Sequence, residues 1–142
     1  MGKKRVIQKT GGSNEGVSKT REVSAAKKIR EGKIYVYSSY NNTIMSLTDL
    51  QGNVLSNVSA GAIGFKGARK ATPFAASKVA DTLSVNAKNR GIEKITVYIK
   101  GIGSGRESAL RALGTKEFEI ISIKDVTPVP HNGPRGRKPR RV

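Results

Sequence analysis

Two glycine-rich segments carry cations that are suited to binding phosphate. The first, GFKGARK at residues 64–70, places Lys66, Arg69 and Lys70 among small residues, and no acid occurs between Asp49 and Asp81. Glycine lets a backbone approach a ligand closely, and Lys and Arg donate hydrogen bonds to phosphate oxygens. A surface loop usually mixes acids with its cations for solubility, so this one is predicted to bind a polyanion.

Two other features near this charge allow both a structural and a binding role. Phe65 could stack on an exposed base or ribose, or it could pin the loop to the core, as an aromatic residue beside a sheet usually does. Asn41 and Asn42 suit a tight turn, and their amides could also bind base edges or riboses. Packing is therefore the favoured interpretation of Phe65, whereas the two roles of Asn41 and Asn42 are not separated by the residue types.

The second segment, GIGSGRES at residues 101–108, lies between a predicted strand and a predicted helix. A dinucleotide-binding GxGxxG fingerprint would need glycine where the chain has Arg106. A simple interpretation is a tight strand-to-helix turn. We favour a phosphate site, in which Gly101, Gly103 and Gly105 expose backbone N–H groups at a helix N-terminus and Arg106 adds charge. Such a site would suit RNA as well as a cofactor.

Catalytic and metal-binding arrangements are not indicated. His131 is the only histidine and lies in a proline-flanked tail, and the chain has no cysteine. A Cys–His pair, a disulfide and a thiolate metal site are therefore excluded. In a Ser–His–Asp arrangement the catalytic base would lie on a mobile tail, which would position it poorly. The acids are too scattered in the sequence to bind a metal ion. We predict no enzyme, cofactor or metal site; the rival hypothesis is an enzyme that binds a nucleotide at residues 101–106.

The overall charge points to a polyanionic partner. The chain has 142 residues, with 27 Lys and Arg against 10 Asp and Glu, for a net charge of +17. Nucleic acid is the first candidate, because each neutralised phosphate releases a counterion. A membrane surface is the second, but we find no basic amphipathic helix or lipid site, no apolar run near the roughly 20 residues of a membrane span and no secretory signal.

The charge pattern divides the chain into three parts. Residues 1–32 hold nine cations and three acids, and are predicted to be a basic arm, with a short helix over residues 22–32 that ends at Gly32. Residues 33–126 are the predicted folded domain. Residues 127–142 hold four prolines and five cations, and proline blocks a helix, so they are predicted to be an extended basic tail.

The middle of the chain predicts an α/β fold in the order βββαβαβ. Strands are expected at residues 33–40, 43–49, 53–60, 94–100 and 117–126 from their alternation and their Val, Ile and Tyr content. Asn41 and Asn42, which tolerate positive φ, predict a tight hairpin, and Gly52 predicts the next turn. Strands separated by helices are expected to be parallel neighbours in a mixed sheet.

Both helices have recognisable ends in the sequence. Thr72 and Pro73 are typical of an N-cap and first helical position, a stripe of Ala76, Val79, Ala80, Leu83 and Ala87 follows, and Gly91 is the expected end. For the second helix, Ser104 and Glu107 have the spacing of a capping box.

Four segments in this order resemble one known family. They are NNTI at residues 41–44, GFKGARKATPFAA at 64–76, KGIGSGRESALRAL at 100–113 and DVTPVPHNG at 125–133. They resemble small-subunit ribosomal protein eleven, and the HNG ending resembles its bacterial and organellar branch. The chain departs from the family at Ile102 and Ser104, where prolines are common, and after Gly133, where a Cys-Arg-Pro-Pro pattern is usual.

The resemblance implies a ribonuclease H-like, three-layer α/β domain with a five-stranded mixed sheet and no nuclease activity. It implies a structural protein on the platform of the small subunit, which bridges helices of 16S-type rRNA near the exit site and the Shine–Dalgarno cleft. Implied neighbours are messenger RNA and small-subunit ribosomal proteins seven and eighteen, in a cytoplasmic or organellar ribosome. With the charged tail, the predicted rRNA-binding residues are Asn41, Asn42, Thr43, Gly64, Phe65, Lys66, Gly67, Arg69, Lys70, Gly101, Gly103, Gly105, Arg106, His131, Asn132, Gly133, Arg135, Arg137, Lys138, Arg140 and Arg141. A DNA-binding accessory protein is a further rival hypothesis.

Overall fold

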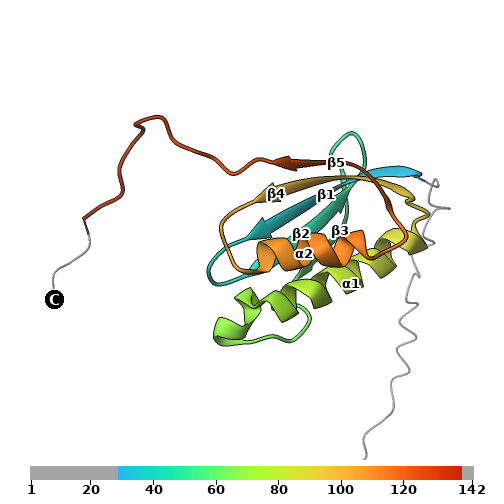
Figure 1. Cartoon of the computed structure of the whole chain (residues 1–142), viewed down its shortest axis with the longest axis horizontal. Coiled ribbons are helices and arrows are strands. Elements are labelled where there is room, and N and C mark those ends of the chain that lie inside the picture. The colour runs from blue at the N-terminus through green and yellow to red at the C-terminus, as the bar shows by residue number, and fades with distance from the viewer. Residues whose placement is uncertain (1–28, 139–142) are drawn as a thin grey trace, which may run out of the picture.

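The computed structural model describes residues 29–138. Its elements follow the predicted order βββαβαβ, with one short 3₁₀ helix, η1, before the first α-helix (Figure 1). In chain order they are β1 (Glu31–Ser38), β2 (Thr43–Thr48), β3 (Val54–Ser59), η1 (Gly67–Ala71), α1 (Pro73–Asn89), β4 (Lys94–Lys100), α2 (Gly105–Gly114) and β5 (Glu119–Asp125).

The strands form one mixed sheet in the order β3-β2-β1-β4-β5. β2 is antiparallel to both β1 and β3, whereas β4 is parallel to both β1 and β5. Strands β1, β3, β4 and β5 therefore point in one direction, and their C-terminal ends meet at one edge of the sheet. This confirms the predicted α/β class, the five-stranded mixed sheet and the parallel pairing of strands separated by helices.

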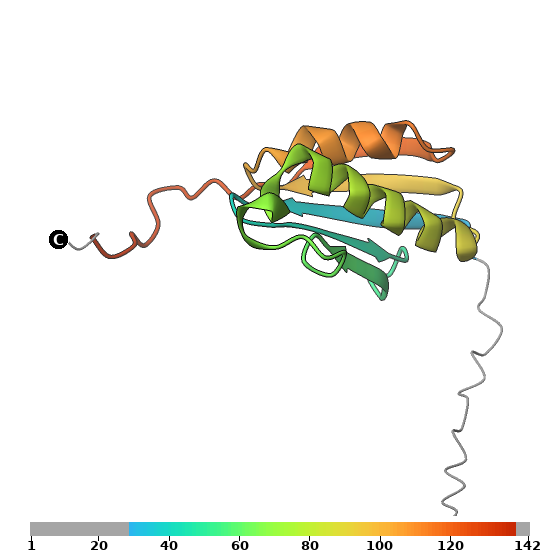
Figure 2. The same ribbon diagram turned by 90° about the horizontal axis from the view of Figure 1, so that it is seen from below.

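Both α-helices cover the same face of the sheet, which is the face turned to the viewer in Figure 2. Alternate residues of each central strand point into the core beneath them: Ile34 and Val36 on β1, and Ile95, Val97 and Ile99 on β4, are all buried. On α1 the predicted apolar stripe is fully buried. Its small Ala side chains bring the helix close to the sheet and to α2.

The ends of α1 agree with the sequence signals. Thr72 is the N-cap, and its Oγ1 accepts a hydrogen bond from the Ala75 N–H at 3.3 Å, with Pro73 in the first helical turn. The chain leaves the helix through Gly91 at φ +78°. A positive φ is readily adopted by glycine, so Gly91 stops α1 as predicted.

The predicted hairpin between β1 and β2 exists, but its mechanism differs from the prediction. Among residues 29–138, Asn132 is the one non-glycine residue with positive φ, at +53°, so Asn41 and Asn42 do not use that conformation. Four residues, 39–42, connect the strands, and the Ser39 N–H donates to the Asn42 carbonyl at 2.9 Å. The Asn42 side chain accepts from the Thr43 N–H, which is the kind of local hydrogen bond that Asn favours in turns.

Two helix predictions are wrong. Ser104 lies at the N-cap of α2 but makes no capping hydrogen bond, because its hydroxyl donates to the Ala71 carbonyl at 2.7 Å instead. A tertiary partner has thus replaced the local one. The short helix that was predicted to end at Gly32 does not do so, since Glu31 and Gly32 belong to β1; its residues 22–28 lie outside the described part of the chain.

Candidate nucleic-acid interface

The C-terminal edge of the sheet brings together the segments that were predicted to bind RNA. The β1–β2 turn, the segment between β3 and α1, the glycine loop between β4 and α2 and the start of the tail all lie there. Both α-helices also begin at this edge. Unpaired N–H groups at a helix N-terminus favour anions, so the backbone adds positive potential to the same surface.

The glycine loop packs directly against the β1–β2 turn, which explains its glycines. An ideal Cβ on Gly101, which has φ +101°, would lie 2.1 Å from the Ser38 carbonyl oxygen, and one on Gly103 would lie 2.3 Å from that of Ser39. One on Gly105 would lie 2.7 Å from Thr43 Oγ1. Gly103 and Gly105 are buried. Tight packing therefore accounts for these glycines, and any contact between the loop and RNA stays a prediction.

Arg106 holds the end of β5 and the start of the tail against the glycine loop. Its Nη1 donates to the Gly101 carbonyl at 2.9 Å and to Thr127 Oγ1 at 3.2 Å, and its Nη2 pairs with Asp125. The hydrogen bond from Arg106, with those from Thr127, lowers the pKa of Asp125 well below its ordinary value. Arg106 thus has a structural role, and its predicted phosphate contact is untested.

The basic segment before α1 is more ordered than a simple loop. Residues 67–71 form η1, and Thr72 joins it to α1 by donating to the Arg69 carbonyl at 2.8 Å. Lys66 and Arg69 are exposed, and Lys70 is half-buried. None of the ion pairs found within residues 29–138 involves these three cations, so their charge is directed to solvent or to a partner.

Phe65 packs partly against the core and also contacts a second aromatic residue. Its ring meets that of Phe74 edge to face, with centroids 6.0 Å apart. Phe74 is 63% exposed, and the ammonium group of Lys78 lies 5.7 Å from its centroid. Ile63, Gly64 and these three side chains line a shallow pocket of about 290 Å³. The core packing interpretation of Phe65 gains support, while an exposed aromatic surface remains beside the cations.

Phe74 and Lys78 were missed from the sequence. A signal was present, because Phe74 lies off the apolar stripe that α1 buries. A large aromatic residue outside the core stripe, next to a basic segment, points outward and is available to a ligand.

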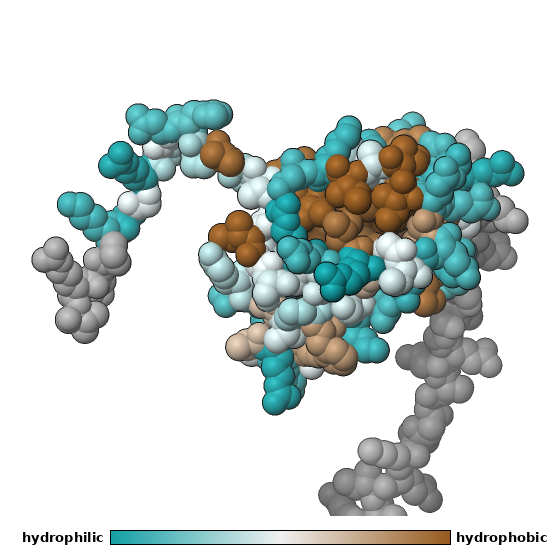
Figure 3. Space-filling model, in the orientation of Figure 1, coloured by the Kyte–Doolittle hydropathy of each residue, from teal (hydrophilic) through white to brown (hydrophobic). Residues whose placement is uncertain are grey.

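The tail leaves the domain at this same edge. Residues 126–138 have no helix or strand, and His131, Asn132, Gly133, Arg135, Arg137 and Lys138 are all exposed. The tail extends away from the body with a largely hydrophilic surface, whereas hydrophobic residues gather on the body where Figure 1 places β5 (Figure 3). Arg140 and Arg141 lie outside the described residues.

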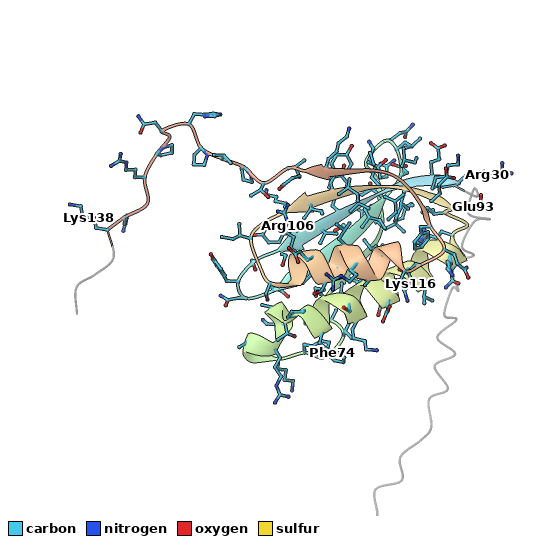
Figure 4. The ribbon with its side chains drawn as sticks, in the orientation of Figure 1. Arg30, Phe74, Glu93, Arg106, Lys116 and Lys138 are labelled. Atoms are coloured by element: carbon cyan, nitrogen blue, oxygen red, sulfur yellow. The ribbon has the colours of Figure 1, made fainter. Side chains whose placement is uncertain are left out.

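The opposite end of the domain holds three ion pairs. Lys88 pairs with Glu117, Lys116 with Asp81 and Lys94 with Glu119. Figure 4 shows Lys116 and Glu93 toward that end, and Arg106 and Lys138 on the side of the tail. Acids therefore offset these three lysines of the far end, whereas no described ion pair offsets Lys66, Arg69 and Lys70.

Comparison with known proteins identifies the family to which the chain belongs. The family model for ribosomal protein S11 matches residues 32–141. The chain belongs to the ribosomal protein S11 family. It is 49% identical over 123 residues to the small ribosomal subunit protein uS11 of two strains of Treponema pallidum, and the match covers 87% of this chain and 98% of each relative. The resemblance, including its bacterial type, is confirmed.

Members of the S11 family are structural proteins of the small ribosomal subunit and not enzymes, which confirms that prediction. Residues 29–138 contain no helix long and apolar enough to cross a membrane. The same residues hold no cluster of three or more His, Asp or Glu side chains that could ligate a metal ion.

Proposed function

We propose that the chain binds 16S-type rRNA on the platform of the small subunit through the C-terminal edge of its sheet. The observation that carries the proposal is the position of its unpaired cations. Lys66, Arg69 and Lys70 lie at this edge and take part in none of the ion pairs found within residues 29–138, and the cations of the tail leave from the same edge, whereas Lys88, Lys94 and Lys116 at the far end are each paired with an acid. Such a surface reads RNA mainly through its backbone and shape.

The arrangement suits a protein that bridges separate RNA helices. The folded edge offers a rigid surface, because the glycine loop, the β1–β2 turn and η1 are joined by packing and by the Ser104–Ala71 hydrogen bond. The tail offers an extended basic strand that fits between helices where a folded domain does not. We place these contacts near the exit site and the Shine–Dalgarno cleft, with messenger RNA and small-subunit ribosomal proteins seven and eighteen as neighbours.

The test is a salt titration of rRNA binding with a triple variant. Changing Lys66, Arg69 and Lys70 to Ala is expected to weaken binding to a platform rRNA transcript and to reduce the slope of log K against log[salt] by about 0.7–0.9 for each phosphate that is no longer neutralised. Filter binding of the full chain at several salt concentrations measures both quantities.

A matched triple variant provides the control. Changing Lys88, Lys94 and Lys116 to Ala removes the same formal charge, but from side chains that are paired with acids at the far end. The affinity and slope of this variant are expected to stay close to those of the wild type. Equal losses in the two variants would show that only net charge matters, and would overturn the assignment to this edge.

A further inference from the structure

The face of the sheet opposite the helices carries a cluster of tyrosines and lysines that the interface described above does not include. Tyr35 and Tyr37 on β1 and Tyr98 on β4 alternate with buried core residues, so they point away from the helices. Tyr35 is 38% exposed and Tyr37 is 44% exposed. Within residues 29–138, both α-helices lie on the other face.

The tyrosines form an ordered row across the sheet. The strand register places Lys124, Tyr98, Tyr35, Ser46 and Asn57 side by side on β5, β4, β1, β2 and β3. The rings of Tyr35 and Tyr98 stack with centroids 5.0 Å apart and an interplanar angle of 13°, and the Lys124 ammonium group lies 5.8 Å from the Tyr98 ring. A stacked cross-strand pair also stabilises a sheet, but that role alone does not require exposed rings.

One side of the Tyr35 ring is left open by this arrangement. Tyr98 covers one face of the ring, and the neighbour on the other side is Ser46, whose side chain is short and hydrogen-bonded to Asn57 at 3.3 Å. The space above Ser46 is therefore bounded by an aromatic face and by polar groups. A nucleobase needs this combination, a surface to stack on and donors or acceptors for its edge.

The charge of the face favours a polyanion. Its acids, Glu31 and Glu119, lie in one row with Lys94 at the far end, where Glu119 pairs with Lys94 at 3.4 Å. From there toward the C-terminal edge, the described side chains on this face include Lys33, Lys100 and Lys124 and no acid. Lys100 is exposed beside Tyr37 in the last row of β1 and β4, so the face continues into the interface proposed above.

We propose that this tyrosine face is a second RNA-binding surface, which stacks bases of an unpaired rRNA segment on Tyr35 and Tyr37 while Lys100 and Lys124 contact its phosphates. The inference rests on the proposed function and deepens it, because it specifies single-stranded nucleotides as the ligand of the sheet. Aromatic residues on an open sheet bind two or three bases in other RNA-binding domains. Residues 1–28 are a poorer occupant by charge, since they carry eight Lys and Arg against two Glu.

The first test compares two double variants of the full chain. Tyr35→Ala with Tyr37→Ala removes the rings, whereas Tyr35→Phe with Tyr37→Phe keeps them and removes only the hydroxyls. The Ala variant is expected to bind a 12-nucleotide single-stranded RNA about tenfold or more weakly than the wild type, because each stacked base contributes enough for at least several-fold. The affinity of the Phe variant for the same RNA is expected to stay within about twofold of the wild type. For an RNA duplex of the same length, both variants are expected to bind as the wild type does.

The outcomes separate this inference from the proposed function. If the Lys66, Arg69 and Lys70 variant loses rRNA affinity while both tyrosine variants bind single strands like the wild type, the inference fails alone. If the Phe and Ala variants lose affinity equally, stacking is not the mechanism and the inference fails as well. Failure of the Lys66, Arg69 and Lys70 variant to change rRNA binding overturns the proposed function instead.

A second test needs no variant and therefore avoids any effect on folding. Small subunits assembled with the wild-type chain are irradiated with ultraviolet light, digested, and analysed by mass spectrometry. Nucleotides crosslinked to Tyr35 or Tyr37 are expected. Crosslinks from these residues to a protein, to residues 1–28 or to nothing would overturn the proposal.

Discussion

Glycine at position 103 is required by the space available and not by its backbone angles. Gly103 does not have a positive φ, but a Cβ there would lie 2.3 Å from the backbone oxygen of Ser39 and 2.5 Å from Ser38 Oγ. Backbone atoms cannot move aside as the end of a flexible side chain can. The glycine loop and the β1–β2 turn therefore depend on each other for their positions.

We predict that Gly103→Ala lowers the free energy of unfolding by about 1–3 kcal/mol, the usual range for overpacking in a tight site. Urea denaturation followed by circular dichroism measures the change in midpoint. Gly114→Ala is the matched control, because nothing lies within 4 Å of a Cβ at that helix position; it is expected to be neutral or stabilising by up to about 1 kcal/mol. Equal midpoints for the two variants would contradict the steric argument.

The contact between Arg106 and Asp125 gives a pH-dependent prediction. Because the hydrogen bond from Arg106 lowers the pKa of Asp125 in the folded protein below its ordinary 3.8, the carboxylate stabilises the fold fully above that value. The stabilisation is lost as the pH falls from about 4 toward the lower folded-state pKa. Asp125→Asn is therefore expected to be less stable than the wild type at pH 7, and the difference is expected to shrink below pH 4.

Urea midpoints of both proteins between pH 7 and pH 2 measure this difference. A difference in midpoint that stays constant down to pH 2 would show that ionisation of Asp125 does not contribute to the stability of the fold. Thr127→Val provides a useful comparison, because it removes a hydrogen-bond partner of the same carboxylate without changing the net charge.

At the scale of elements, Thr72 connects the basic segment to α1. Its Oγ1 accepts from the Ala75 N–H in α1 and donates to the Arg69 carbonyl in η1. Thr72→Ala is predicted to lower the free energy of unfolding by about 0.5–2 kcal/mol, as is usual when an N-cap is removed, and to weaken rRNA binding because η1 loses its attachment. Thermal denaturation and filter binding measure the two effects.

Two other substitutions serve as controls for Thr72→Ala. Thr72→Ser keeps the hydroxyl and is expected to behave like the wild type. Thr82→Ala changes the same residue type within α1, where the hydroxyl bonds only to the Lys78 carbonyl on the exposed side; alanine is the better helix former there, so no loss is expected. A destabilised Thr82→Ala protein would mean that helix interior effects, and not the cap, explain Thr72→Ala.

The sequence predicted features that depend on local chemistry and missed those that depend on tertiary contacts. Alternation in the strands, the Thr72–Pro73 start and the stop at Gly91 are encoded within a few residues, so they were recovered. Ser104 has the spacing of a capping box, but its hydroxyl bonds to Ala71, 33 residues away. Asn41 and Asn42 favour positive φ, yet a four-residue turn stabilised by Ser39 made that unnecessary.

The candidate interface was partly predictable for the same reason. In GFKGARK the cations lie within a few residues of one another, so Lys66, Arg69 and Lys70 could be identified from the sequence alone. The row of Tyr35, Tyr98 and Lys124 was not, because its members come from three strands and meet only through the sheet register. Phe74 could have been found from its position off the buried stripe of α1.

At the scale of the whole molecule, positive charge is divided among a folded edge, an extended tail and residues 1–28, which carry eight Lys and Arg against two Glu. At the far end of the domain, ion pairs offset the charges of Lys88, Lys94 and Lys116, although exposed pairs of this kind contribute little to stability. Their larger effect is on recognition, since they offset three lysines of the far end, whereas Lys66, Arg69 and Lys70 have no acidic partner among the described ion pairs. Association with RNA is then oriented as well as strengthened.

The tail allows this division of charge to be tested in one experiment. Deleting residues 131–142 removes five cations and leaves the Arg106, Asp125 and Thr127 contacts in place. The urea midpoint is expected to stay unchanged, because residues 126–138 form no helix or strand and the deleted residues among them, 131–138, are exposed. The salt slope for platform rRNA is expected to fall by up to about 0.7–0.9 per deleted cation, and the remaining slope reports the contacts of the folded domain.

Combining the deletion with the Lys66, Arg69 and Lys70 variant should add the two reductions, because the two sets of cations bind different phosphates. A combined reduction no greater than that of the deletion alone would show that the tail and the basic segment contact the same phosphates, and that the protein holds one RNA helix where we infer that it bridges two.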